Sequence, residues 1–187
     1  MTPMDTFTPQ IVGLLALLTI AGQLLSIMLL VVVLLRRKSA AVPACRWVAA
    51  HGLLFMLIIA ATATAGSLYF SEIALWTPCK LCWFQRIFMY PQVPLLLVAL
   101  WKHDRGIATY ILLLSVIGMV FSSVHYTEQV MAALQPPSDP LEPCDLTGVS
   151  CASAPSFYFG YITIPMMAFT AFLLNALIAR TAMRMKS

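Results

Sequence analysis

The sequence predicts an all-α protein, a polytopic bundle of helices that cross a membrane. Of its 187 residues, 61% are hydrophobic and only 10% are charged, and its mean hydropathy is +0.90. Soluble domains carry about a quarter charged residues, so this composition excludes an ordinary soluble protein. The apolar stretches suit membrane-spanning helices and are far too long for the strands of a barrel. The chain carries no internal repeat and no motif that binds nucleic acid.

Five stretches are long and apolar enough to cross a bilayer, which takes about 20 residues of helix. They cover residues 11–35, 48–70, about 84–101, 107–126 and 157–179. The leader before the first stretch holds Asp5 and no basic residue, and a basic cluster follows the stretch. A signal peptide has a basic leader and a short apolar core. We therefore expect the first stretch to be a retained transmembrane helix.

The third stretch is the least regular of the five. It contains Gln85, Arg86 and Gln92, and Pro91 and Pro94 remove backbone donors from it. Prolines are tolerated in membrane helices because neighbouring groups satisfy the carbonyls that they free. We therefore expect a kinked helix here and not a break.

Basic residues orient the predicted bundle. Nine of the eleven lie in alternate loops or at the C-terminus: Arg36, Arg37, Lys38, Arg46, Lys102, Arg105, Arg180, Arg184 and Lys186. Loops rich in Lys and Arg stay in the cytoplasm. The sequence thus predicts a cell-membrane protein of five spans, with its N-terminus outside and its C-terminus cytoplasmic. The outer loops then cover residues 71–83 and 127–156.

The five cysteines divide into two outer pairs and one single residue. Cys79 and Cys82 lie in the first outer loop, directly before the third stretch, and Cys144 and Cys151 lie in the second outer loop. Cys45 lies alone at the cytoplasmic edge, where we expect a reduced thiol. The two pairs face the side of the membrane on which disulfides persist.

The first pair is better suited to redox chemistry than to stabilising the fold. A disulfide between Cys79 and Cys82 closes a very short loop, so the loop-entropy argument gives it little stabilising value. If a helix starts near Cys82, its N-terminus favours a thiolate there. Arg86 lies four residues further on and therefore on the same face. A cation at the membrane boundary is costly, which makes Arg86 a candidate functional residue, with snorkelling to the headgroups as the alternative.

The second pair lies in a loop rich in proline, serine and acidic residues, which suits an exchange of disulfides with a soluble partner. We expect no metal site, because zinc ligand pairs usually have about two to four intervening residues, Cys144 and Cys151 have six, and no histidine completes a neater set. The chain also has no βαβ pattern that would make its CxxC motif part of a thioredoxin domain.

Two segments together resemble one family. The run "CKLCWFQRIFMYP", with paired outer-loop cysteines and "GYITIPMMAF" in the last stretch, is similar to the DsbB/BdbC family of membrane disulfide-bond formation proteins. The resemblance extends from about Trp47 to Ala179. It implies a four-helix DsbB-like redox domain over residues 47–187, preceded by an additional transmembrane helix and a basic cytoplasmic loop over residues 1–46. No role can be assigned to that helix from the sequence.

The resemblance assigns the first pair to electron transfer. It implies that Cys79 and Cys82 pass electrons to a membrane quinone, ubiquinone or menaquinone, and that Arg86 lines the quinone site. It also places His125 near the quinone, although a structural interfacial histidine is an equal alternative. Gln85 is a further candidate for contact with the ligand, equally explained as a polar residue that faces the bundle.

The resemblance assigns the second pair to partner oxidation. Cys144 and Cys151 would take electrons from a reduced thioredoxin-fold oxidase of the DsbA/BdbD type, most simply through attack at Cys144. The short spacing of this pair departs from some relatives, which leaves the order of the relay open. The alternatives are an enzyme like vitamin K epoxide reductase, in which the loop pair comes earlier in the chain, and a non-enzymatic bundle with two structural disulfides.

Overall fold

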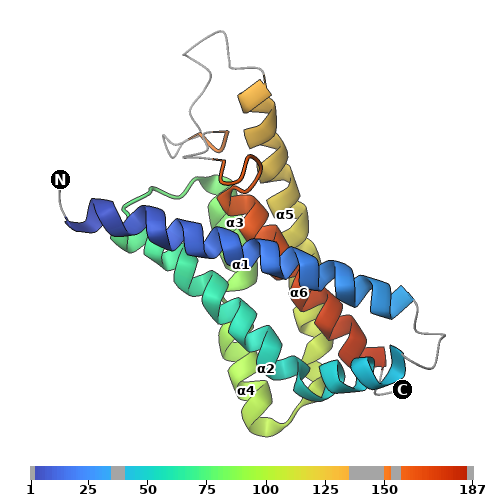
Figure 1. The fold of residues 1–187 in the computed structure, drawn as a ribbon. Coiled ribbons are helices and arrows are strands. Elements are labelled where there is room, and N and C mark those ends of the chain that lie inside the picture. Colours follow the sequence, from blue (N-terminus) through green and yellow to red (C-terminus); the bar gives the residue numbers. More distant parts are fainter. Residues whose placement is uncertain (1–2, 35–40, 135–149, 153–156, 185–187) are drawn as a thin grey trace.

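The protein is a bundle of helices with one helix laid across it (Figure 1). The computed structural model describes residues 3–34, 41–134, 150–152 and 157–184. Its six α-helices are α1 (Pro3–Leu34), α2 (Ala41–Leu68), α3 (Lys80–Met89), α4 (Gln92–Lys102), α5 (Ala108–Leu134) and α6 (Ile164–Arg184). A π-helical turn, η2 (Tyr69–Ile73), extends α2, and a 3₁₀ turn, η3 (Arg105–Ile107), precedes α5.

Four helical segments in the described part are long and apolar enough to cross a membrane. They are Thr8–Val31, Ala50–Ile73, Arg105–Leu134 and Ile164–Arg184. The described residues contain no β-strand beyond an isolated bridge between Tyr158 and Ile162. The prediction of an all-α, multi-pass membrane bundle is therefore confirmed.

The third predicted stretch forms two short helices, α3 and α4, joined at Tyr90 and Pro91. Both joining residues keep right-handed helical dihedral angles, so the chain turns here without leaving helical conformation. Pro94 cannot donate to the Tyr90 carbonyl, which instead accepts from the amide of Val93 at 3.2 Å. The side chain of Gln92 donates to the carbonyl of Phe88 at 3.0 Å. The backbone carbonyls at the kink are therefore hydrogen-bonded locally.

A buried polar network joins α4, α5 and α6 in the core. Gln92 is fully buried and accepts a hydrogen bond from Asn175 Nδ2 at 2.9 Å, while its own amide reaches Ser115 Oγ at 3.4 Å. Gly118 lies directly against the ring of Phe172, and a Cβ atom at this glycine would overlap that ring. Small residues of this kind allow close helix packing in membranes, where hydrophobic burial does not drive helices together.

Two helix boundaries differ from the predicted spans. α5 continues beyond Tyr126 to Leu134, because the polar residues Thr127, Glu128 and Gln129 do not break a helix and residues 130–134 are apolar again. The last helix begins at Ile164 and not at residue 157. Ahead of it, Gly160 has a φ of +82° in a turn that returns the chain to α6.

Candidate functional site

The CxxC motif lies at the start of α3. Cys79 is the N-cap, with extended backbone (ψ 173°), and the helix begins at Lys80, two residues before the expected start at Cys82. Cys82 therefore lies in the first helical turn, where unpaired amides favour a thiolate. The two sulfur atoms are 3.4 Å apart, and the Cys79 thiol donates to Cys82. A thiol pair at this separation closes to a disulfide with a small side-chain movement.

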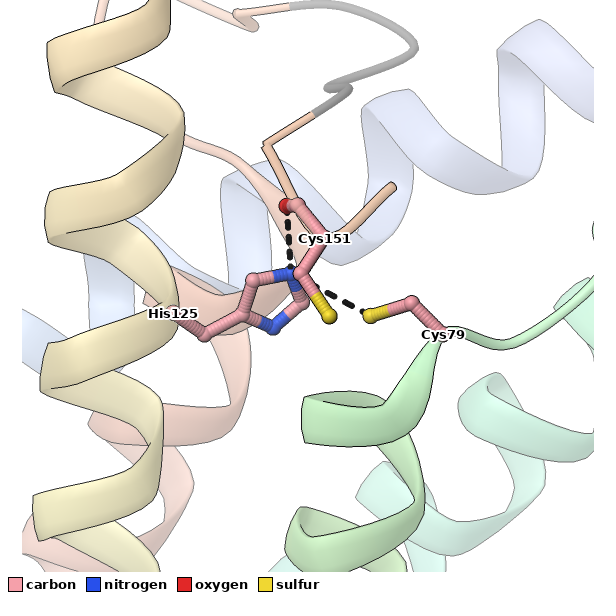
Figure 2. A group of neighbouring side chains, drawn as sticks. All are labelled: Cys79, His125 and Cys151. Atoms are coloured by element: carbon pink, nitrogen blue, oxygen red, sulfur yellow. Dashed lines mark hydrogen bonds between the residues drawn. The ribbon is translucent and has the colours of Figure 1, made fainter. Parts of the chain in front are cut away.

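Cys151 joins this pair from a distant part of the chain. The backbone amide of Leu81 donates to Cys151 Sγ at 3.4 Å. The sulfur atoms of Cys79 and Cys151 and a ring nitrogen of His125 all lie within 4.8 Å of one another. Figure 2 shows these three side chains converging from the start of α3, from α5 and from the segment ahead of α6. Cys79 is thus the shared neighbour of Cys82 and Cys151.

His125 connects the cysteines to α3. Its Nε2 lies 3.1 Å from the carbonyl oxygen of Cys151 and 3.7 Å from Cys79 Sγ. A carbonyl oxygen only accepts, so Nε2 carries the proton. Nδ1 is then free to accept from the amide of Gln85, at 2.9 Å. This neutral tautomer orients the ring, and the ring in turn holds the backbone of Cys151 beside Cys79.

The reduced cysteines differ in acidity. Cys82 precedes the apolar part of the third stretch. Its pKa is lowered by the thiol hydrogen bond from Cys79, by the Cys79 backbone amide and, less strongly, by Arg86. The same thiol hydrogen bond, together with burial, raises the pKa of Cys79 to about 12. Burial and a hydrogen bond with Cys79 raise the pKa of Cys151 to about 12. Among these three thiols, Cys82 is the one that ionises readily.

Arg86 is buried and held by α2. Its Nε donates to Ser67 Oγ at 3.0 Å, and its Nη2 donates to the carbonyl of Ser67 at 3.1 Å. The guanidinium carbon lies 5.2 Å from the ring centre of Trp83 and 6.0 Å from that of Tyr90, within the range of cation–π attraction. The hydroxyl of Tyr90 also donates to Ser67 Oγ at 3.1 Å. These contacts hold the guanidinium of Arg86 against α2.

A mostly apolar cavity of about 330 Å³ opens beside Cys82 and Arg86. Gln85 and Ser67 complete its polar side, and Trp76 stacks on Phe70 at its margin. Residues of α1, α2 and α6 supply the remaining, largely apolar wall. A cavity with an apolar lining and a few convergent polar groups is the usual form of a small-molecule site. A ligand bound here would lie beside Cys82.

The structure brings together most of the residues that the sequence singled out. Cys82, Gln85 and Arg86 line the cavity, whereas His125 is not among the lining residues and reaches the cavity through Gln85. Cys144 lies outside the described residues. Cys45 lies in α2, and its side chain also lies outside the described part.

Sequence reasoning missed two contributors to the site. Ser67 holds Arg86 but is an ordinary serine in an apolar helix, so no local signal marks it. Gln129 lies four residues after His125, with its amide nitrogen 3.3 Å from Nε2 of that ring; both atoms are donors in the tautomer described above, so this is a packing contact and not a hydrogen bond. The four-residue spacing on α5 was the one available signal for this contact.

The cluster of Cys79, His125 and Cys151 also contains metal ligands. Two thiolates and an imidazole form a ligand set that Zn²⁺ accepts. The sequence argument against zinc considered the spacing of the loop pair and found no histidine to complete a neater set. This set instead draws one cysteine from each pair and its histidine, His125, from α5. Disulfide formation removes these ligands, so metal binding and redox exchange exclude each other here.

The family model and the similar proteins found by comparison all point to one family. The model of the family described as disulfide bond formation protein DsbB matches residues 45–182. Disulfide bond formation protein C of Bacillus subtilis (strain 168) is 43% identical over 117 residues, covering 63% of this chain and 81% of the relative. A probable disulfide formation protein of Metapseudomonas resinovorans is 36% identical over 126 residues, covering 67% of this chain and 85% of the relative. No solved structure matches the chain significantly.

Proposed function

Because the chain belongs to the DsbB family of disulfide bond formation proteins, we propose that it reoxidises an extracytoplasmic thioredoxin-fold oxidase of the DsbA/BdbD type and passes the electrons to membrane quinone. The protein is then a quinone-dependent thiol–disulfide oxidoreductase that supports disulfide formation in exported proteins. The position of Cys79, within reach of both Cys82 and Cys151, is the observation that carries this proposal.

The relay begins at the outer loop. A thiolate of the reduced partner attacks Cys144 in the Cys144–Cys151 disulfide, which forms a mixed disulfide and releases Cys151 as a thiolate. The second partner thiol later attacks the mixed disulfide, so the partner leaves with a disulfide and Cys144 keeps a thiol. Two electrons and two protons have then moved from the partner to the enzyme.

Cys151 then passes its electrons to the CxxC motif. The released thiolate attacks Cys79, forms a Cys79–Cys151 disulfide and expels Cys82. Exchange is faster when the leaving thiolate has a low pKa, which matches the lowered pKa of Cys82. Cys144 next attacks Cys151, which re-forms the loop disulfide and leaves Cys79 and Cys82 as a dithiol.

The cavity beside Cys82 fits a quinone. Arg86 offers donors to a ring carbonyl oxygen, Gln85 offers an amide, and the rest of the wall is apolar. A bound quinone accepts two electrons and two protons, which balances the oxidation of one dithiol to one disulfide. Cys82 holds the reactive thiolate at the cavity wall, and Cys79 closes the disulfide. His125 positions Cys151 for exchange and contacts the cavity only through Gln85.

The membrane arrangement follows from the same scheme. The four spanning segments, together with α3 and α4 as a fifth and kinked span, place the CxxC motif and Cys151 at one end of the bundle. The distribution of Lys and Arg makes that end extracytoplasmic, with the N-terminus outside and the C-terminus inside a cell membrane. The donor is then in water and the acceptor in lipid, and the dithiol lies between them.

The variant Cys82→Ser tests this relay. It should abolish quinone reduction, leave the soluble partner reduced and hold Cys144 and Cys151 as thiols, because no Cys79–Cys82 disulfide can form to accept their electrons. Alkylation followed by non-reducing peptide mapping by mass spectrometry identifies which cysteines are thiols. Cys45→Ser is the matched control and should turn over like the wild type. Continued quinone reduction by Cys82→Ser would show that the electron path is wrong.

A further inference from the structure

The additional N-terminal helix forms part of the candidate quinone cavity. The family model begins at residue 45, so all of α1 lies outside it. Leu15, Leu18, Thr19 and Gly22 of α1 nevertheless line the cavity, together with the polar residues of α3. Figure 1 shows α1 running across the bundle over α6. This chain therefore closes its cavity with an element that the family core does not contain.

Close packing holds α1 in this position. Its buried residues recur three or four positions apart, which forms one stripe along the helix: Val12, Ala16, Thr19, Gly22, Ser26 and Leu29. A Cβ atom at Gly22 would lie 3.0 Å from Thr170 and 3.1 Å from Leu174, both on α6. Such small residues let two membrane helices approach closely. The part of the cavity wall that α1 forms is therefore packed tightly against α6, which fixes its position.

Polar contacts hold α1 at two further points. The hydroxyl of Tyr161 donates to Gln23 Oε1 at 2.7 Å, which ties α1 to the segment just before α6. The hydroxyls of Thr8 and Tyr69 lie 3.3 Å apart, which ties the start of α1 to η2. α1 is therefore joined to the same outer end of the bundle that carries the cysteines.

The cavity reaches the lipid-facing surface between α1 and α2. Leu18 on α1 is 49% exposed and Ile58 on α2 is 51% exposed, and both also line the cavity. A side chain that belongs to both a cavity wall and the outer surface marks the edge of an opening. Because these helices face lipid, the opening leads into lipid.

We propose that α1 supplies a binding wall for the isoprenoid tail of the quinone, and that the tail leaves the cavity between α1 and α2, past Leu18 and Ile58. The inference rests on the proposed quinone function. The polar groups of α3 bind the ring at one side, and about 330 Å³ leaves little room for a long prenyl chain as well. The tail must therefore exit, and the apolar opening between two lipid-facing helices matches its chemistry.

Binding of long-tailed and tail-free quinones tests the proposal. The double variant Leu18→Trp/Ile58→Trp narrows the opening. The matched control Leu17→Trp/Leu54→Trp changes equally lipid-facing residues of the same helices that do not line the cavity. The probes are ubiquinone and menaquinone, each compared with its tail-free ring, dimethoxymethylbenzoquinone or menadione. Equilibrium dissociation constants are measured with purified, full-length protein in detergent.

The double variant should bind the long-tailed quinone at least about tenfold more weakly, because apolar contact along the tail is lost, and should bind the tail-free ring within about twofold of the wild type. The control should bind both like the wild type. Equal weakening for both probes, or no weakening for either, would overturn the role of the opening. If the wild type binds no quinone at all, the proposed function itself fails, and this inference fails with it.

A cross-linking measurement on the wild type keeps the test independent of variant folding. A long-tailed quinone with a diazirine on the tail is bound and irradiated, and the labelled peptides are mapped. Labels on α1 and α2 around Leu18 and Ile58 would support the exit route. Labels confined to α4, α5 or α6 would contradict it even if the protein reduces quinone normally.

Discussion

The hydrogen bond between the two CxxC thiols should set the reactivity of Cys82 in the reduced protein. Cys79 donates to Cys82 over 3.4 Å, and this bond is the first cause of the lowered pKa of Cys82. The variant Cys79→Ala removes the donor and retains Arg86. We expect the pKa of Cys82 to rise in this variant, so that fewer Cys82 side chains are ionised at a given pH.

The size of the effect follows from the energy of such a bond. A hydrogen bond to a charged group contributes about 1.5–3 kcal/mol, which corresponds to a roughly 10- to 150-fold change in the population of the thiolate. Part of this loss is offset, because a thiolate of higher pKa is a stronger nucleophile, with a Brønsted coefficient of about 0.4–0.5. At a pH below both pKa values, alkylation of Cys82 should therefore slow by roughly 4- to 15-fold.

The assay is the rate of iodoacetamide labelling of reduced protein, followed for each cysteine peptide by mass spectrometry across a pH series. Arg86→Ala should slow Cys82 less than Cys79→Ala does, since the Arg86 charge is the smaller cause. An unchanged rate in Cys79→Ala, or a larger effect of Arg86→Ala, would refute the reasoning.

Three further predictions concern packing and the site. Gly22→Val should lower stability by about 1–3 kcal/mol, because its side chain collides with α6. Gly13→Val should leave stability unchanged, because a side chain there meets nothing within 4 Å. Thermal denaturation in detergent compares the two variants. Ser67→Ala removes an acceptor of Arg86 and should raise the KM for quinone severalfold with little change in exchange with the soluble partner; equal losses in both assays would make that contact purely structural. His125→Ala should slow exchange between the two cysteine pairs in rapid-quench experiments while Cys82 labelling persists, and unaltered exchange would remove its positioning role.

The fold was predictable because lipid restricts the choices. Long apolar stretches in this composition leave only helices, and the structure confirms an all-α membrane bundle. Helix ends were less predictable. The polar residues Thr127, Glu128 and Gln129 end the apolar stretch without ending the helix, so the extension of α5 to Leu134 was missed. The start of α6 was also misplaced. Residues 157–163 are apolar and were therefore included in the predicted span, but they contain the turn at Gly160.

The site was predictable only where it is local. The four-residue spacing of Cys82 and Arg86 predicts a shared helix face, and both residues line the cavity. Contacts between distant segments left no local signal. The amide of Leu81 meets Cys151 across 70 positions, and Arg86 meets Ser67 across 19. The wall that α1 contributes is a tertiary feature of the same kind, which composition and spacing do not report.

Reconstitution in lipid tests the central claim most directly. The purified protein is incorporated into vesicles with a long-tailed quinone, and a reduced thioredoxin-fold oxidase is added outside. Partner oxidation is followed by thiol titration while quinone reduction is followed by absorbance. The account predicts one quinol for each partner disulfide formed, with both signals lost in Cys82→Ser. Partner oxidation that proceeds without quinol formation would contradict it.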